Sequence, residues 1–175
     1  ANLHGLRGRA LFIDLDTILL GDIDVMFEQP GALVAIDNDP WRDKTGKPQT
    51  MSSVFAFDIG SLNHVVERLQ SDRDVLVKRH TIEQAFLHAA IESISYWPQE
   101  WLVSFKYHLR RPLLVDRFLP PKIPSKQARL LIFHGKPRPV DLARPPKGNW
   151  DVFPHFGSGA VPWIKSYWEE HGGRV

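Results

Sequence analysis

The chain contains no cysteine, which excludes disulfide bonds, thiolate metal sites and a cysteine nucleophile. This absence fits a reducing compartment, and we expect a cytoplasmic protein. Basic residues number 22 and acidic residues 20, so the formal charge of +2 is too balanced to indicate a nucleic-acid-binding protein. No apolar run approaches the roughly 20 residues that a transmembrane helix needs, and Ala1–Arg9 lacks the apolar core of a signal peptide.

The length of 175 residues is enough for one domain with a hydrophobic core and short for two. Hydrophobic residues make up 43% of the chain and charged residues 24%, the composition of an ordinary globular protein. We therefore expect a single domain over residues 1–175.

Short apolar runs that close on an aspartate occur three times, as RALFID, LVAID and SVFAFD at residues 9–14, 33–37 and 53–58. Such runs are typical of strands covered on both faces, as in parallel sheets. Further strands are predicted at SISYWP and RLLIFHG, and residues 38–50 are predicted to be a loop. Helices are predicted after Gly60, from Thr81, where Gln84 completes a capping-box pattern, and over residues 161–170. This alternation predicts an α/β fold with a mixed, mainly parallel sheet flanked by helices.

The first strand has the pattern of an interior strand, yet only nine residues precede Ala10. Interior parallel strands need neighbours on both sides and long crossover connections. Either later strands supply both neighbours, or nucleotide-binding strands precede Ala1 in a longer protein. We favour the second interpretation.

Asp14 and Asp16 follow this first strand with one leucine between them. If extended geometry persists to Asp16, both carboxylates face the same side. Two close carboxylates are stabilised by a hard divalent cation, and Mg²⁺ or Mn²⁺ is the natural choice. The alternative is that one aspartate caps a turn while the other faces solvent.

Four segments resemble nucleotide-sugar-dependent glycosyltransferases of the GT-A fold, close to the family 8 pattern of glycogenin and bacterial galactosyltransferases. RGRALFIDLDTILLGDID resembles the D-x-D segment of the family, and MSSVFAFD resembles the strand beside the sugar site. TIEQAFL resembles the D-Q helix start, and FHGKPRP resembles the closing H-x-x-G-x-x-K-P segment. The four occur in the family's order.

The resemblance implies roles for nine residues. Metal ligands would be Asp14, Asp16 and His134, although Ile132 occupies the family's histidine position. Groups that bind the donor would be Lys136, Arg138, Ser52 and Ser53, with Arg138 in the place of the family's lysine. The pair close to the transferred sugar, in the catalytic position, would be Glu83 and Gln84.

The implied activity is that of a hexosyltransferase, with a UDP-sugar or related nucleotide-sugar as donor and a carbohydrate or other hydroxyl compound as acceptor. Bond cleavage builds negative charge on the diphosphate, which a divalent ion and a cation neutralise.

Two other functions remain open at the level of sequence. Haloacid-dehalogenase-like phosphohydrolases also carry D-x-D after an apolar strand, but Ile18 stands where they have threonine or valine, and Thr17 comes one residue early. A non-catalytic, truncated sugar-binding module is the second alternative.

Overall fold

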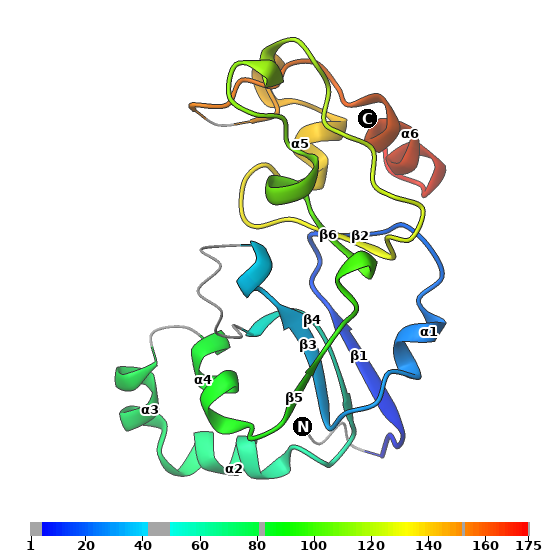
Figure 1. The fold of residues 1–175 in the computed structure, drawn as a ribbon. Helices are drawn as coiled ribbons and strands as arrows, with labels where there is room; N and C mark the ends of the chain where they lie inside the picture. Colours follow the sequence, from blue (N-terminus) through cyan, green and yellow to red (C-terminus); the bar gives the residue numbers. More distant parts are fainter. Residues whose placement is uncertain (1–4, 42–49, 81–82, 152, 175) are drawn as a thin grey trace. The chain divides into compact units, whose positions relative to one another are not determined.

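The computed structural model describes residues 5–41, 50–80, 83–151 and 153–174. The chain divides into two compact units, each built from two stretches of sequence (Figure 1). The first unit comprises Ala1–Asp14 and Asp22–Gln99, and the second comprises Leu15–Gly21 and Glu100–Val175.

The first unit contains a four-stranded sheet in the order β1-β4-β3-β5. Its strands are β1 (Arg9–Ile13), β3 (Leu33–Asp37), β4 (Thr50–Asp58) and β5 (Ile94–Tyr96). Strand β4 pairs antiparallel with both β1 and β3, whereas β5 pairs parallel with β3. Strands β1, β3 and β5 therefore run in one direction and β4 in the other.

Helices of the first unit bury one apolar cluster against this sheet. The helices are α1 (Asp24–Phe27), α2 (Asn63–Ser71), α3 (Arg73–Arg79) and α4 (Glu83–Ala90), with a 3₁₀ turn, η1 (Asp39–Trp41). The cluster combines residues of β3, β4, the three longer helices and the positions just before α2 and just after α4, namely Leu33, Phe57, Leu62, Val65, Leu76, Phe86 and Ile91. Helix α1 lies apart from the other three, beside β1 (Figure 1).

The second unit contains a three-stranded sheet in the order β2-β7-β6. The strands are β2 (Thr17–Leu19), β6 (Leu102–Ser104) and β7 (Leu130–Ile132). Strand β2 pairs antiparallel with β7, and β6 pairs parallel with β7. The middle strand β7 is fully buried because it has a neighbour on each side and core residues against it.

The second unit's core joins this sheet to its helices. They are α5 (Pro139–Ala143) and α6 (Pro162–Glu170), a π-helical turn η3 (Phe105–Leu109), and 3₁₀ turns η2 (Gln99–Trp101), η4 (Val115–Arg117) and η5 (Pro146–Gly148). The core cluster includes Phe105, Phe133, Leu142, Trp150 and Ile164. Trp163 and Trp168 on α6 pack against it, as expected from the helical pattern.

The α/β class is confirmed, and both sheets are mixed. Strand β1 pairs only with β4 among the described residues, and the pairing is antiparallel. Its apolar run is explained by contacts across that pair, since Phe12 stacks on Phe55 with ring centroids 4.8 Å apart. Among the described strands, three pairs are antiparallel and two are parallel, and in each sheet most strands run in one direction.

Two further expectations differ in detail. Residues 38–50 were expected to form a loop, yet Trp41 is buried at the end of η1. Thr81, the expected start of the second long helix, lies outside the described residues, and α4 is described from Glu83. In the part of the chain that the structure describes, no helix is both long and apolar enough to cross a membrane.

Candidate functional site

One edge of the first unit's sheet gathers the ends of three strands that run in the same direction. Asp14 follows β1 at this edge, and its backbone N–H donates a hydrogen bond of 2.9 Å to the carbonyl oxygen of Ser53 on β4. Ser53 is nearly buried and Ser52 is half-buried. The structure therefore places Asp14 directly beside one of the two serines predicted to bind the donor.

Of the three aspartates that follow or end an apolar strand, two lie at one end of this sheet and the third lies at the opposite end. Asp37, at the end of β3, shares the edge of Asp14, because β1 and β3 run in the same direction. Asp58 ends the oppositely directed β4, and its carboxylate accepts from Arg9 Nη1 at 3.1 Å. Ligands of open α/β sheets bind outside the carboxyl ends of the parallel strands, so Asp58 is on the wrong side for such a site.

Asn38 is a residue at this edge that the sequence pattern did not single out. It follows Asp37, is only 1% exposed, and its Oδ1 has no hydrogen-bond partner within the described ranges. Buried amide oxygens in native proteins are normally hydrogen-bonded. The Asn38 Oδ1, at the same end of the sheet as Asp14, is therefore a candidate contact for a ligand. The sequence offered one signal for Asn38, namely that it is a polar residue directly after a predicted buried strand.

Glu83 and Gln84 begin α4 as it is described, and Gln84 is half-buried. The capping box predicted for Gln84 involves Thr81, which is outside the described residues. Helix α4 is tied to the start of β4, because His88 Nδ1 lies 2.9 Å from the hydroxyl oxygen of Thr50. The helix that carries the predicted catalytic pair is therefore fixed to the strand that carries Ser52 and Ser53.

Extended geometry does not persist from Asp14 to Asp16. Strand β1 ends at Ile13, and Leu15 and Asp16 form a turn before β2 begins at Thr17. Leu15 is fully exposed, because the chain leaves one sheet and enters the other at this point. Asp14 belongs to the first unit and Asp16 to the second. Even fully extended, two residues span at most about 7 Å between Cα atoms, so the chain itself limits the separation of the Asp14 and Asp16 Cα atoms.

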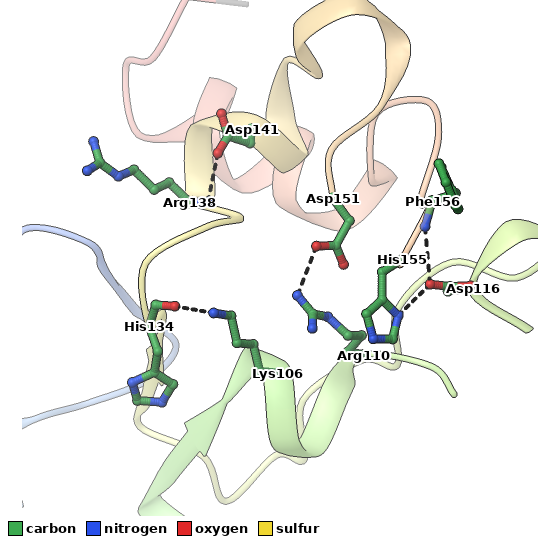
Figure 2. A network of polar contacts seen from close by, with 9 residues as sticks. All are labelled: Lys106, Arg110, Asp116, His134, Arg138, Asp141, Asp151, His155 and Phe156. Carbon is green, nitrogen blue, oxygen red and sulfur yellow. Dashed lines mark hydrogen bonds and ion pairs between the residues drawn. The ribbon is translucent and has the colours of Figure 1, made fainter. Parts of the chain in front are cut away.

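Two predicted metal ligands, Asp16 and His134, lie at one end of the second unit's sheet together with Lys106. Thr17 pairs with Ile132, and Ser104 also pairs with Ile132. Asp16 precedes β2, His134 follows β7 and Lys106 follows β6, so all three lie at the same end of the sheet. The Lys106 ammonium donates to the carbonyl oxygen of His134 (Figure 2).

His134 does not continue the strand as the sequence pattern predicted. Strand β7 ends at Ile132, whose side chain is completely buried and offers no ligand. Beyond it, the carbonyl of His134 accepts a hydrogen bond from the side chain of Lys106. The imidazole lies near Tyr107, with ring centroids 6.0 Å apart.

Lys106 is a functional candidate that the sequence-based assignment of phosphate-binding cations left out. Burial lowers its pKa below 10.5, and the positive charge of Arg110 lowers it further, while Asp151 acts in the opposite direction. A lysine held among other charges at the end of a sheet is a candidate anion ligand, because a bound anion would favour its charged form. Its place beside His134 depends on a contact across 28 residues of sequence.

Lys136 and Arg138, the cations predicted for the diphosphate, are both exposed. Arg138 precedes α5, and its backbone N–H donates to Asp141 Oδ2 at 2.9 Å. Figure 2 shows its guanidinium extending away from Asp141 and from Arg110. Both cations follow His134 closely in sequence and belong to the second unit.

Solved structures of three glycosyltransferases are similar to this chain. GlyE from Streptococcus pneumoniae TIGR4 matches with a TM-score of 0.54 and 13% identity, over 97% of this chain and 41% of GlyE. The galactosyltransferase LgtC, in complex with donor and acceptor sugar analogues, matches with 0.52 and 11%, over 93% of this chain and 61% of LgtC. The bifunctional WbbM matches with 0.51 and 12%, over 75% and 29%. The chain has a glycosyltransferase fold.

The similarity to these glycosyltransferases is one of fold, at identities of 10–13%. The chain spans less than two thirds of the length of each. No family model matches the sequence, and no curated protein does.

The glycosyltransferase fold leaves the metal site to be tested. Within the described ranges, no group of three or more histidine, aspartate or glutamate side chains is gathered closely enough to hold a metal ion. Asp14 stands in one unit, and Asp16 and His134 stand in the other. The predicted ligand set of these three residues therefore stays a prediction.

Proposed function

We propose that this chain belongs to a metal-dependent glycosyltransferase that moves a hexose from a nucleotide-diphosphate donor, a UDP-sugar, to a hydroxyl acceptor such as a carbohydrate. The observation that carries the proposal is the pairing of β2 with β7 in a glycosyltransferase fold. It places the strand end preceded by Asp16 beside the strand end followed by His134. LgtC, one of the similar structures, was determined with donor and acceptor sugar analogues.

The donor set suits a divalent cation. Asp14 and Asp16 supply hard carboxylate oxygens, and their Cα atoms are no more than about 7 Å apart. His134 follows the strand that pairs with β2, and its imidazole would complete the ligand set that the resemblance implies. These three residues would hold Mn²⁺ or Mg²⁺, which supplies charge neutralisation to the departing diphosphate.

The chain's own cations would bind the phosphates of the donor. Lys106 is fixed at the His134 carbonyl, and Lys136 and Arg138 follow within the next few residues. A phosphate group close to Lys106 would raise its lowered pKa again, because a neighbouring anion favours the ammonium form. Positive charge at this end of the second unit would stabilise the leaving group as its charge develops.

The first unit would contribute to recognition of the sugar. Ser52 and Ser53 lie on β4, and the Ser53 carbonyl accepts from the Asp14 backbone N–H. Because successive side chains of a strand face opposite sides of the sheet, the hydroxyl of one of the two serines would donate to sugar oxygens. Gln84 and Glu83 stand at the start of α4, which is fixed to β4 through Thr50. A carboxylate or an amide oxygen from this pair would stabilise positive character on the anomeric carbon.

Titration of UDP into the chain by calorimetry, with and without Mn²⁺, tests the proposal. We expect Mn²⁺-dependent binding that falls about 100-fold in Asp14→Asn and Asp16→Asn, because each loses a charged metal ligand. Asp58→Asn is the matched control, since Asp58 also ends an apolar strand but lies at the opposite edge. The proposal is wrong if UDP binding ignores Mn²⁺ or if all three variants behave alike.

Two further measurements separate the alternatives. Tight binding of beryllium fluoride at Asp14 would indicate a phosphohydrolase. Ile18, which stands where haloacid-dehalogenase-like phosphohydrolases have threonine or valine, is buried in the core. Metal-dependent UDP binding without hydrolysis of the UDP-sugar or transfer to any acceptor would indicate the non-catalytic module.

A further inference from the structure

Exposed apolar side chains concentrate in one short stretch of the second unit. Within residues 113–123, six large apolar side chains are exposed, among them Phe118 at 84% and Ile123 at 75%. The other four are Leu113, Leu114, Val115 and Leu119. Contiguous exposed apolar residues on a folded protein mark interaction sites, whereas single ones are ordinary. We call residues 113–123 the apolar segment.

The polarity of the apolar segment is inverted, with its acid inside and its large apolar residues outside. Asp116 is 3% exposed, and its Oδ2 lies 2.6 Å from Nδ1 of His155. The same oxygen accepts from the backbone N–H of Phe156 at 3.3 Å (Figure 2). Burying a carboxylate is unfavourable unless it is hydrogen-bonded, so these contacts anchor the turn η4 by Asp116. Anchored in this way, the turn holds Phe118 toward solvent.

Phe156 extends the exposed apolar surface next to this anchor. The guanidinium of Arg117 lies over the Phe156 ring, 4.8 Å from its centroid. Phe156 in turn contacts Phe153, which is 82% exposed, with ring centroids 5.9 Å apart. Aromatic side chains are thus added to the aliphatic ones of the apolar segment.

Charge on and beside the apolar segment is of one sign at the surface. Arg117, Lys122 and Lys126 are exposed and Arg111 is half-buried. The one acid between residues 110 and 129 is Asp116, which is buried. A surface that combines exposed apolar groups with positive charge is complementary to an anionic lipid surface, whose phosphates meet the cations while acyl chains take up the apolar side chains.

A hollow beside the segment has the same combination. It measures about 460 Å³, and its lining includes Pro120, Pro121 and Pro162 as apolar walls, with the cations Arg111 and Lys122. Trp163 also lines it, and its buried indole N–H has no hydrogen-bond partner in the described part of the chain. The two cations suit a phosphate group, and tryptophan is characteristic of the membrane–water interface.

We propose that the apolar segment is a membrane-docking element that inserts Phe118 and Ile123 into the surface of a bilayer rich in anionic phospholipid. Arg117, Lys122 and Lys126 face the lipid phosphates, and the hollow at Trp163 receives a headgroup. The attachment is peripheral and reversible. It is independent of the proposed transferase activity, since none of these residues belongs to the candidate site.

Co-sedimentation with vesicles tests this proposal on the whole chain. Vesicles of phosphatidylcholine with phosphatidylglycerol should bind it, whereas pure phosphatidylcholine vesicles should bind at least tenfold more weakly. Phe118→Ser with Ile123→Ser should reduce binding more than tenfold, because both side chains leave the membrane interior. Lys122→Gln with Lys126→Gln should reduce it about 20-fold at low salt. The matched control is Val75→Ser with Val77→Ser, a pair on α3 that is 66% and 61% exposed.

A second measurement gives the depth of insertion. Phe118→Trp should show stronger fluorescence quenching by brominated lipids than Val75→Trp in the same vesicles. Absence of vesicle binding, equal binding to neutral and anionic vesicles, or equal quenching of the two tryptophan variants would each overturn the proposal. Mn²⁺-dependent UDP binding should be unchanged in Phe118→Ser with Ile123→Ser, which separates this proposal from the transferase.

Discussion

Arg110 and Asp151 form a buried ion pair in the second unit. The guanidinium Nη2 lies 2.8 Å from the Asp151 carboxylate, whose side chain has no exposed surface, while 13% of the Arg110 side chain is exposed (Figure 2). This pair also sets the charge around Lys106, whose pKa is lowered by Arg110 and raised by Asp151.

Asp151→Asn should lower the free energy of unfolding by about 3–5 kcal/mol, because it leaves the Arg110 charge buried without its counter-ion. Glu169→Gln is the control, since Glu169 pairs with Lys165 at the surface and such a pair is worth about 0.3–0.5 kcal/mol. Urea unfolding followed by circular dichroism measures both. Equal effects of the two substitutions would contradict the buried-pair interpretation.

Lys106→Gln should weaken Mn²⁺-dependent UDP binding about tenfold or more, because a charged hydrogen bond to the diphosphate is lost. The glutamine amide can still donate to the carbonyl oxygen of His134, so the fold is kept while the charge is removed. Lys165→Gln, at an exposed ion pair in the same unit, should leave the affinity unchanged. If both variants bind UDP like the original chain, Lys106 is not a phosphate ligand.

His108 should make the protein less stable in mild acid. Burial, with the charge of Lys122 as a smaller cause, lowers the pKa of His108 below its ordinary 6.5, and its Nδ1 accepts from the backbone N–H of Ser104 at 2.9 Å. The unfolded chain therefore binds the proton more readily, so the stability that the neutral ring contributes is complete above pH 6.5 and is lost as the pH falls through the lowered pKa.

His108→Asn retains an acceptor for the Ser104 amide and removes the titration. Urea unfolding at pH 7.5 and 5.5 should show a smaller loss of stability in this variant than in the original chain. Parallel losses in the two proteins would show that protonation of His108 is not coupled to folding.

Gly157→Ala should destabilise the second unit by about 3 kcal/mol or more, because an added Cβ would stand 1.9 Å from the indole ring of Trp150. That ring is buried and is held edge-on by Phe105, with centroids 5.7 Å apart. At Gly21 the nearest atom to an added Cβ is 3.4 Å away, so Gly21→Ala should change the stability by less than about 1 kcal/mol. Thermal unfolding compares the two, and similar melting temperatures would argue against tight packing at Trp150.

Elements with strong local patterns could be predicted from the sequence. Strand β3 was predicted with its bounds, and helix α6 to within one residue. The apolar run of β3 ends at Asp37, and the apolar face of α6 begins at Pro162, so local residues mark these boundaries. The antiparallel pairing of β1 with β4 was not predicted, because an apolar run does not show in which direction the neighbouring strand runs.

Features that depend on distant pairing could not be predicted. The turn at Leu15 and Asp16 arises because Thr17 joins β7 in the second unit, and nothing local distinguishes it from continued strand. The place of Lys106 beside His134 was likewise not predicted, since it follows from a contact across 28 residues.

The separation of β2 from β7 in sequence bears on how the protein is made. Thr17 leaves the ribosome more than a hundred residues before its partner Ile132, so the early strand must wait for the late one before the second sheet can close. Nascent chains that halt before Leu130 would expose Ile18, a core residue, and would depend on chaperones. Any fragment that begins after Gly21 would lack this strand and leave the buried middle strand as an open edge.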